Sequence, residues 1–199
     1  MSGQDSVKKP RVFGIHHIGI NVPDLEAGRR FYESVFGFEV VGVDNWQEGN
    51  KDVNAYVGLD ESSADSYMLR GCNTFLELWT YRTPASTTNA FDRVASDHGY
   101  THVAFSVMDF DAVLEDLLQA GGSIIKPLTD ARPGGAKIHY CRDPFGNIIE
   151  LLELPDDAGG HIRSLPGVEQ DGVFAEPVDE YYVFEDGEFQ GMRSKQELP

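Results

Sequence analysis

Apolar and polar positions follow the same pattern in two stretches of the chain, Phe13 to Gly42 and Thr101 to Pro127. Each stretch begins with the alternation of a strand, continues as an amphipathic helix and returns to a strand after a glycine. In the first stretch Asp24 has the chemistry of a helix N-cap, and Gly37 that of the left-handed residue that ends a helix. The pattern therefore predicts strand, helix and strand, in this order, in both stretches.

The two stretches form an internal repeat with a constant offset of 85 positions. The matched pairs are His17 and His102, Val22 and Val107, Asp24 and Asp109, Ala27 and Ala112, and Gly37 and Gly122. A constant offset over five pairs constrains the architecture before any single element is assigned. We therefore expect two copies of one structural unit, with Asp109 as the N-cap of the second helix.

A strand near the end of each unit carries a central glutamate. The segments FLELW (Phe75 to Trp79) and IIELL (Ile148 to Leu152) align Glu77 with Glu150 at an offset of 73. The first unit therefore holds 12 more residues than the second between its helix and this strand. We predict that the longer region contains a strand near Val53 to Leu59.

Taken together, these elements predict an α+β fold of two βαβββ modules related by an internal repeat, with a C-terminal extension. The boundaries are 12–81 for the first module, 82–97 for a linker, 98–154 for the second module and 155–199 for the extension. We expect the extension to cover part of the body. Its aromatic segment, Tyr181 to Phe184, is a candidate for a strand that faces a partner.

Composition narrows the class of function. The chain has 199 residues, of which 41% are hydrophobic, and a formal net charge of −17, which disfavours binding to nucleic acid or to an anionic membrane. It has no apolar run long enough to cross a bilayer, and its first residues do not resemble a secretory signal. Two cysteines are too few for a disulfide scaffold, so we expect a cytoplasmic protein.

The repeat places two histidines and two glutamates at equivalent positions, His17, Glu77, His102 and Glu150. A carboxylate in the middle of an apolar strand is costly to bury unless a positive charge compensates it. A divalent cation supplies that charge, and neutral imidazoles complete its ligands. We therefore expect one divalent metal ion per chain, with Ni, Co, Zn, Mn and Fe all compatible with these ligands.

Strand alternation also sorts the neighbours of these residues. Phe75, Trp79 and Tyr81 share the face of Glu77 and are predicted to line a substrate pocket, with ordinary packing as the alternative. His16 is expected to face the helix side. The remaining histidines, which have no repeat partner, stay unassigned: His98, His139 and His161.

The chain from Val12 to Leu154 resembles the vicinal oxygen chelate superfamily, which includes glyoxalase I, methylmalonyl-CoA epimerase, extradiol dioxygenases and antibiotic-resistance proteins. The residues that carry the resemblance are His17-Ile18-Gly19, Asp24, Phe31-Tyr32, Leu76-Glu77-Leu78, Thr101 to Ala104, Asp143 to Asn147 and Ile149-Glu150-Leu151. The resemblance implies that the paired modules form a half-closed mixed β-barrel around a metal bound by all four repeat-equivalent residues.

The resemblance favours a divalent-metal-dependent lyase or isomerase of the glyoxalase or epimerase type. Such an enzyme abstracts a proton next to a carbonyl through a metal-stabilised enediolate, with Glu77 or Glu150 as the catalytic base. The aromatic residues beside Glu77 indicate a small apolar or aromatic substrate. The alternatives are an Fe(II) ring-cleaving dioxygenase and a non-catalytic binding protein of the resistance type. A homodimer is expected because the sheet edges need covering.

Overall fold

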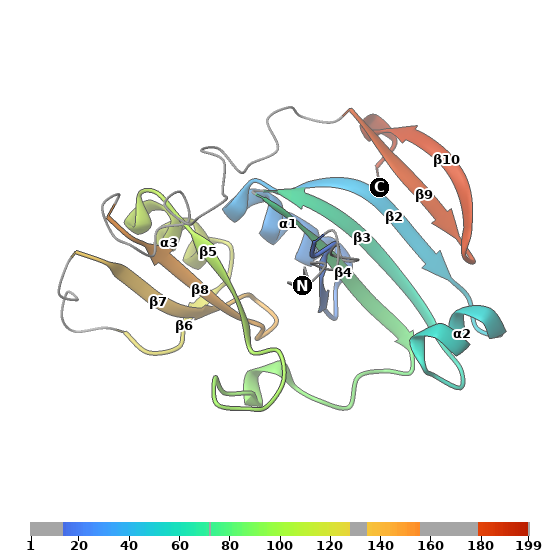
Figure 1. Ribbon diagram of the computed structural model, residues 1–199, viewed down its shortest axis with the longest axis horizontal. Helices are drawn as coiled ribbons and strands as arrows, with labels where there is room; N and C mark the ends of the chain where they lie inside the picture. Colours follow the sequence, from blue (N-terminus) through green and yellow to red (C-terminus); the bar gives the residue numbers. More distant parts are fainter. Residues whose placement is uncertain (1–13, 72, 128–134, 156–178, 199) are drawn as a thin grey trace, which may run out of the picture.

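The computed structural model describes residues 14–71, 73–127, 135–155 and 179–198, which form an α+β structure of two sheets and three α-helices (Figure 1). The first sheet has the strand order β1-β4-β3-β2-β9-β10 and the second the order β5-β8-β7-β6. The strands of the first sheet are β1 (Ile18–Asn21), β2 (Glu39–Trp46), β3 (Ser63–Gly71), β4 (Thr74–Thr83), β9 (Glu180–Glu185) and β10 (Glu188–Ser194). Those of the second are β5 (His102–Ser106), β6 (Ser123–Ile124), β7 (Lys137–Arg142) and β8 (Ile148–Glu153).

Strand pairing follows the same register in both sheets. Strand β1 runs parallel to β4 with Gly19 opposite Glu77, and β5 runs parallel to β8 with Ala104 opposite Glu150. Gly19 and Ala104 are 85 positions apart, the offset of the repeat in the sequence. Each glutamate therefore occupies the same place relative to the first strand of its sheet.

The first helix ends as its sequence predicts. Helix α1 (Leu25–Phe36) begins after Asp24, whose carboxylate accepts a hydrogen bond from the backbone N–H of Ala27 at 2.9 Å. It ends at Gly37, which has a φ of 68°. These two caps satisfy backbone groups that a helix end leaves without partners.

The second helix differs from the prediction at its start. Helix α3 (Phe110–Gln119) is preceded by Asp109, but this residue has a φ of 59° and its side chain makes no capping bond. The carboxylate of Glu153 on β8 accepts the backbone N–H of Phe110 instead, at 3.3 Å. Asp109 therefore occupies the N-cap position as predicted, but Glu153 and not the side chain of Asp109 supplies the capping bond.

The longer region of the first module forms a helix where a strand was predicted. Helix α2 (Lys51–Val57) begins after Asn50, which accepts the N–H of Val53 at 3.1 Å, and ends at Gly58 with a φ of 73°. The alternation of apolar residues suggested a strand, but the Asn and Gly caps decide the local structure. A short 3₁₀ helix, Ala90–Asp92, lies in the connection between the sheets.

The C-terminal segment forms a hairpin that extends the first sheet. Strand β9 pairs in parallel with β2, with Gly42 opposite Tyr182, and antiparallel with β10. The turn between the two strands uses Asp186 and Gly187, which have φ values of 52° and 83°. Both edges of β9 are therefore paired within the chain, and contact of Tyr181 to Phe184 with a partner stays a prediction.

The larger of two hydrophobic clusters in the described residues joins the two sheets. Its buried members include Tyr32 and Val35 of α1, Leu76 and Leu78 of β4, Phe105 of β5, Leu117 of α3, and Ile149 and Leu151 of β8. Phe36 stacks on Phe105 with ring centroids 4.1 Å apart, and the hydroxyl of Tyr32 donates to the buried Asp143 at 3.1 Å. Helices α1 and α3 contact each other in this layer.

The two sheets therefore contribute their helix-covered faces to a common core and do not close into one barrel within the described part of the chain. The predicted half-closed barrel around a metal is wrong for a single chain. Among the described residues, no helix combines the length and the apolar character needed to span a membrane.

Candidate functional site

The first candidate pair lies on the open face of the first sheet. The Nε2 atom of His17 is 3.2 Å from Oε2 of Glu77. The same carboxylate oxygen accepts the indole N–H of Trp79 at 2.8 Å. His17 precedes β1 directly, and Glu77 lies in the middle of β4, so pairing of β1 with β4 brings the two side chains together.

His16 also lies at this site, contrary to the prediction that it faces the helix side. Its Nδ1 is 2.7 Å from Nδ1 of His17, and its ring stacks on Phe75 with centroids 6.2 Å apart. Strand alternation does not apply here because β1 begins only at Ile18. One imidazole must donate and the other accept, so the hydrogen bond links the tautomers of the two rings.

The second candidate pair repeats this geometry in the other sheet. Nε2 of His102 is 3.0 Å from Oε2 of Glu150, and Nδ1 of His102 is 2.9 Å from the hydroxyl of Thr101. The ring of His102 meets that of Tyr140 edge to face at 5.0 Å. Each sheet thus presents one imidazole and one carboxylate next to each other.

One chain does not bring the two pairs together. Leu76, Leu78, Ile149 and Leu151 flank the two glutamates and point into the shared core. Since alternate residues of a strand point to opposite faces, Glu77 and Glu150 point away from that core on separate sheets. Accordingly, the described residues include no group of three or more His, Cys, Asp or Glu side chains that could hold a metal ion.

Each pair nevertheless fits half of a metal site. Two ligand atoms bound at about 2.1 Å to one ion and at right angles lie about 3 Å apart, which is the separation within each pair. A neutral imidazole and a carboxylate are also ligands that first-row divalent metals accept. Two such pairs would provide the four predicted ligands.

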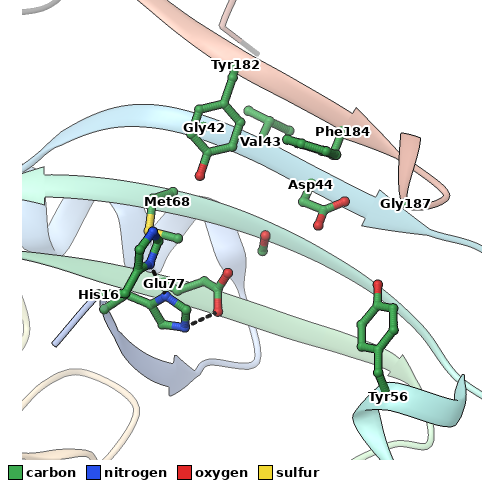
Figure 2. A pocket seen from close by; sticks show the side chains of 12 residues that line it. His16, Gly42, Val43, Asp44, Tyr56, Met68, Glu77, Tyr182, Phe184 and Gly187 are labelled. Atoms are coloured by element: carbon green, nitrogen blue, oxygen red, sulfur yellow. Dashed lines mark hydrogen bonds and ion pairs between the residues drawn. The ribbon is translucent and has the colours of Figure 1, made fainter. Parts of the chain in front are cut away.

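A cavity of about 300 Å³ adjoins the first pair (Figure 2). His16, His17 and Glu77 form one side of it. The opposite side comes from β2, β9 and α2: Gly42, Val43, Asp44, Tyr182, Phe184 and Tyr56. This volume is at the small end of the range for small-molecule sites.

Asp44 is a cavity residue that the sequence reasoning missed. Its Oδ1 atom is buried and has no hydrogen-bond partner in the described part of the chain. Burial, aided by the negative charge of Glu77, raises the pKa of its carboxyl to about 6. The signal was present in the sequence, because Asp44 interrupts the strand EVVGVDNW as Glu77 interrupts FLELW.

The three aromatic residues predicted to line a substrate pocket lie on the face of Glu77 but beside the cavity. Trp79 and Tyr81 pack against Trp46, and Phe75 packs against His16. Their contact with a substrate stays a prediction. His139 faces the helix side, where its ring meets Phe110, and His161 lies outside the described residues.

Comparisons with known proteins identify the family of this chain. A model of the Glyoxalase/Bleomycin resistance protein/Dioxygenase superfamily matches residues 14–151. The chain is 31% identical to a 2-epi-5-epi-valiolone epimerase of Actinomyces sp. over 160 residues, which cover 75% of this chain and 84% of that protein. It is 27% identical to a lactoylglutathione lyase of Haemophilus influenzae over 148 residues, or 73% of this chain and 96% of the lyase.

A solved structure shares the fold. A glyoxalase family protein from Bacillus cereus superposes with a TM-score of 0.65 at 22% identity, over 75% of this chain and 100% of that structure. The matched region of the superfamily model ends before β9, so the C-terminal hairpin lies beyond it.

Proposed function

We propose that this chain, which belongs to the Glyoxalase/Bleomycin resistance protein/Dioxygenase superfamily, is a metal-dependent epimerase of a small hydroxylated cyclic ketone. Its relatives carry the names of an epimerase and of lactoylglutathione lyases, which supports an isomerase or lyase of this superfamily. The observation that carries the proposal is the pair of imidazole–carboxylate half-sites at repeat-equivalent positions.

A complete site requires two copies of the chain. In a dimer with twofold symmetry, the open face of the first sheet of one copy meets the open face of the second sheet of its partner. The twofold rotation also brings the second sheet of the first copy against the first sheet of the partner. A dimer would therefore hold two equivalent sites. This arrangement gives one metal ion per chain and closes a barrel that a single chain leaves open.

His17, Glu77, His102 and Glu150 would hold the metal, with the first two from one copy and the last two from the other. When bound, a divalent cation supplies Lewis-acid chemistry, which favours the build-up of negative charge on a carbonyl oxygen. The hydrogen bond that the indole of Trp79 donates to Glu77 holds the carboxylate on the cavity side of β4. His16 orients the ring of His17 through their shared hydrogen bond.

Epimerisation needs a base on each side of the reacting carbon. Glu77 would remove the proton next to the carbonyl, while the electron pair of the broken C–H bond moves to the carbonyl oxygen as an enolate forms. Glu150 of the partner copy, which is protonated at this stage, would then deliver its proton to the opposite face of the same carbon, and the carbonyl re-forms. Glu77 would lose the proton that it took to solvent and Glu150 would regain one from solvent, so no other reactant is needed, and the roles reverse in the other direction.

Exchange of substrate hydrogen with solvent tests this proposal directly. We expect the metal-loaded protein to introduce deuterium from D₂O into 2-epi-5-epi-valiolone at the carbon next to the carbonyl. Loss of a positioned base costs typically 10²- to 10⁴-fold, so Glu77→Gln and Glu150→Gln should each lower the exchange rate by at least about 100-fold. Glu188→Gln, at an exposed position on β10, is the matched control.

Metal content gives the second readout. We expect about one divalent ion per chain in the wild-type protein by elemental analysis, and reduced metal affinity in His17→Ala and His102→Ala. Protein that binds no metal after reconstitution, or that exchanges hydrogen equally well after chelation, would contradict the mechanism. Oxygen uptake with catechols by the iron-loaded protein would favour the dioxygenase instead.

A further inference from the structure

We propose that Asp44 and Tyr182, with Tyr56 at the rim, form a wall that binds the hydroxyl groups of a polyhydroxylated ring opposite the reacting carbon. This inference rests on the proposed function for the identity of the reaction, and it adds the residues that select the substrate. It assigns a role to two elements beside the first module that have no counterpart at the second, α2 and the C-terminal hairpin.

Asp44 is placed to accept hydrogen bonds from a ligand. It projects from β2 into the cavity across from Glu77 on β4, and its buried Oδ1 has no partner in the described part of the chain (Figure 2). A buried polar atom without a partner costs free energy that a suitable ligand group can recover. A ligand hydroxyl in the cavity can donate to the Asp44 carboxylate, whereas a hydrocarbon surface cannot.

Tyr182 reaches the same cavity from the C-terminal hairpin. Its ring lies over Gly42 of β2, where any side-chain carbon would overlap the ring. Figure 2 shows its hydroxyl directed into the space between β2 and β4, toward which Glu77 also points. Among the described residues, no group hydrogen-bonds this hydroxyl, so it is available as a donor or an acceptor.

Tyr56 completes the wall from helix α2. Its side chain is 69% exposed, and its hydroxyl points from the rim toward Asp44 in Figure 2. Burial raises the pKa of both Tyr56 and Tyr182, with a further contribution from the negative charge of Asp44. Both hydroxyls therefore keep their protons at neutral pH and can donate hydrogen bonds.

The charge of the cavity favours a neutral polyol over an anionic substrate. Asp44 and Glu77 are acidic, and the described residues that line the cavity include neither lysine nor arginine. On the side away from the proposed metal, a substrate phosphate or carboxylate would meet Asp44 with no lysine or arginine in the described lining to balance its charge. Hydroxyl groups suit such a surface because each can donate to a carboxylate and accept from a tyrosine.

The wall is confined to the first module. Between its helix and its last strand the first module has 12 residues more than the second, and α2 lies in this longer region. Strand β9 extends the first sheet only. Each module thus carries two of the predicted metal ligands, whereas the hydroxyl-binding residues lie only on the first sheet and on α2 beside it.

Two probes separate hydroxyl recognition from the chemistry. In the metal-loaded protein, we expect 2-epi-5-epi-valiolone to exchange hydrogen with a much lower KM than 2-hydroxycyclohexanone, which has the ketone and a single hydroxyl. Removal of one hydrogen bond to a charged group costs about tenfold or more in affinity. Asp44→Asn and Tyr182→Phe should therefore raise the KM for the polyol at least about tenfold, and raise that for 2-hydroxycyclohexanone much less.

Matched controls are available on the same elements and elsewhere. Asp52→Asn lies on α2 at an exposed position, and Tyr100→Phe changes a fully exposed tyrosine. Both variants should keep wild-type values for the two probes. Calorimetric titration of the Glu77→Gln protein with the polyol measures binding without turnover. When Asp44→Asn is added to this variant, we expect the affinity for the polyol to fall at least about tenfold.

The outcomes distinguish this inference from the proposed function. If the wild-type protein exchanges hydrogen and Asp44→Asn and Tyr182→Phe do not change the KM for the polyol, the hydroxyl-binding wall is wrong and the epimerase proposal is unaffected. Polyol binding that depends on Asp44 and Tyr182 without any exchange would support the wall and overturn the epimerase. Absence of both binding and exchange in the metal-loaded wild-type protein would overturn both.

Discussion

At the scale of single residues, Asp44 makes the stability of the protein depend on pH. The pKa of its carboxyl is about 6 in the folded protein, whereas an unfolded aspartate titrates near about 3.9. The folded state therefore holds this proton more tightly, and its contribution to stability is full below about pH 4 and lost as the pH rises through about 6. The ionised carboxylate of Asp44 thus lowers the stability of the folded protein at neutral pH, which is consistent with a role in ligand binding.

We predict that Asp44→Asn is more stable than the wild-type protein at pH 8 by about 1 kcal/mol, after allowance for solvent that reaches the cavity. The difference should shrink at pH 5, where the wild-type carboxyl is largely protonated. Urea unfolding of the metal-free proteins at both pH values measures it. Asp52→Asn is the control, and an equal gain at both pH values would contradict the ionisation of Asp44 as the cause.

The sequence identified some residues of the site better than others. Glu77 and Glu150 were paired by the repeat, and each lies within 3.2 Å of the histidine that the repeat assigned to its module. His16 was misplaced because strand alternation was applied to a residue that precedes the strand. Asp44, Tyr56 and Tyr182 were missed because they have no repeat partner, and the repeat was the main guide.

At the scale of elements, the hairpin of β9 and β10 depends on a glycine in a neighbouring strand. The ring of Tyr182 occupies the space that a side chain at Gly42 would fill. We predict that Gly42→Ala displaces this ring and loosens β9, so that amide hydrogens of residues 180–194 exchange faster. Gly19→Ala is the matched control, because no atom lies within 4 Å of the added carbon.

Mass-spectrometric hydrogen exchange of the two variants measures this difference. The double variant Gly42→Ala/Tyr182→Ala should recover the protection of β9, since the smaller side chain no longer overlaps the added methyl group. Unchanged protection in Gly42→Ala alone would show that the hairpin binds independently of the ring. The polyol KM should follow the position of the ring and rise in Gly42→Ala.

Local sequence signals predicted the elements that carry their own caps. Helix α1 has an apolar stripe between Asp24 and Gly37, and both cap residues act as expected. Helix α2 was mistaken for a strand although Asn50 and Gly58 bracket it in the same way. The pairing of β9 with β2 joins segments about 140 residues apart, and neither turn chemistry nor periodicity contains information about such a contact.

At the scale of the whole molecule, the sequence described the modules but not their arrangement. Both sheets present an apolar face next to a helix, and either a shared barrel or a shared core can bury these faces. Contacts of Phe36 with Phe105 and of Tyr32 with Asp143 show that the two modules of one chain bury these faces in a shared core. The four repeat-equivalent residues are therefore split between two open faces, and the four-ligand site that we propose depends on a second copy.

Mixing two inactive variants tests this dependence. Glu77→Ala removes a ligand from the first module and Glu150→Ala one from the second, so each homodimer has two damaged sites. In a mixed dimer, one site combines both damaged modules and the other combines both intact modules. When equal amounts of the two variants pair at random, half of the dimers are mixed. Each mixed dimer has one intact site and one damaged site. Unfolding and refolding the two variants together should restore about one quarter of wild-type activity.

The rescue also separates the two ways of building the site. If one chain supplied all four ligands, every chain in the mixture would carry a damaged site, and activity would stay at the level of the single variants. The control is a mixture of Glu77→Ala with Glu77→Ala/Glu150→Ala, in which no pairing yields an intact site. Recovery in the first mixture and not in the second would require that His17 and Glu77 of one copy work with His102 and Glu150 of another.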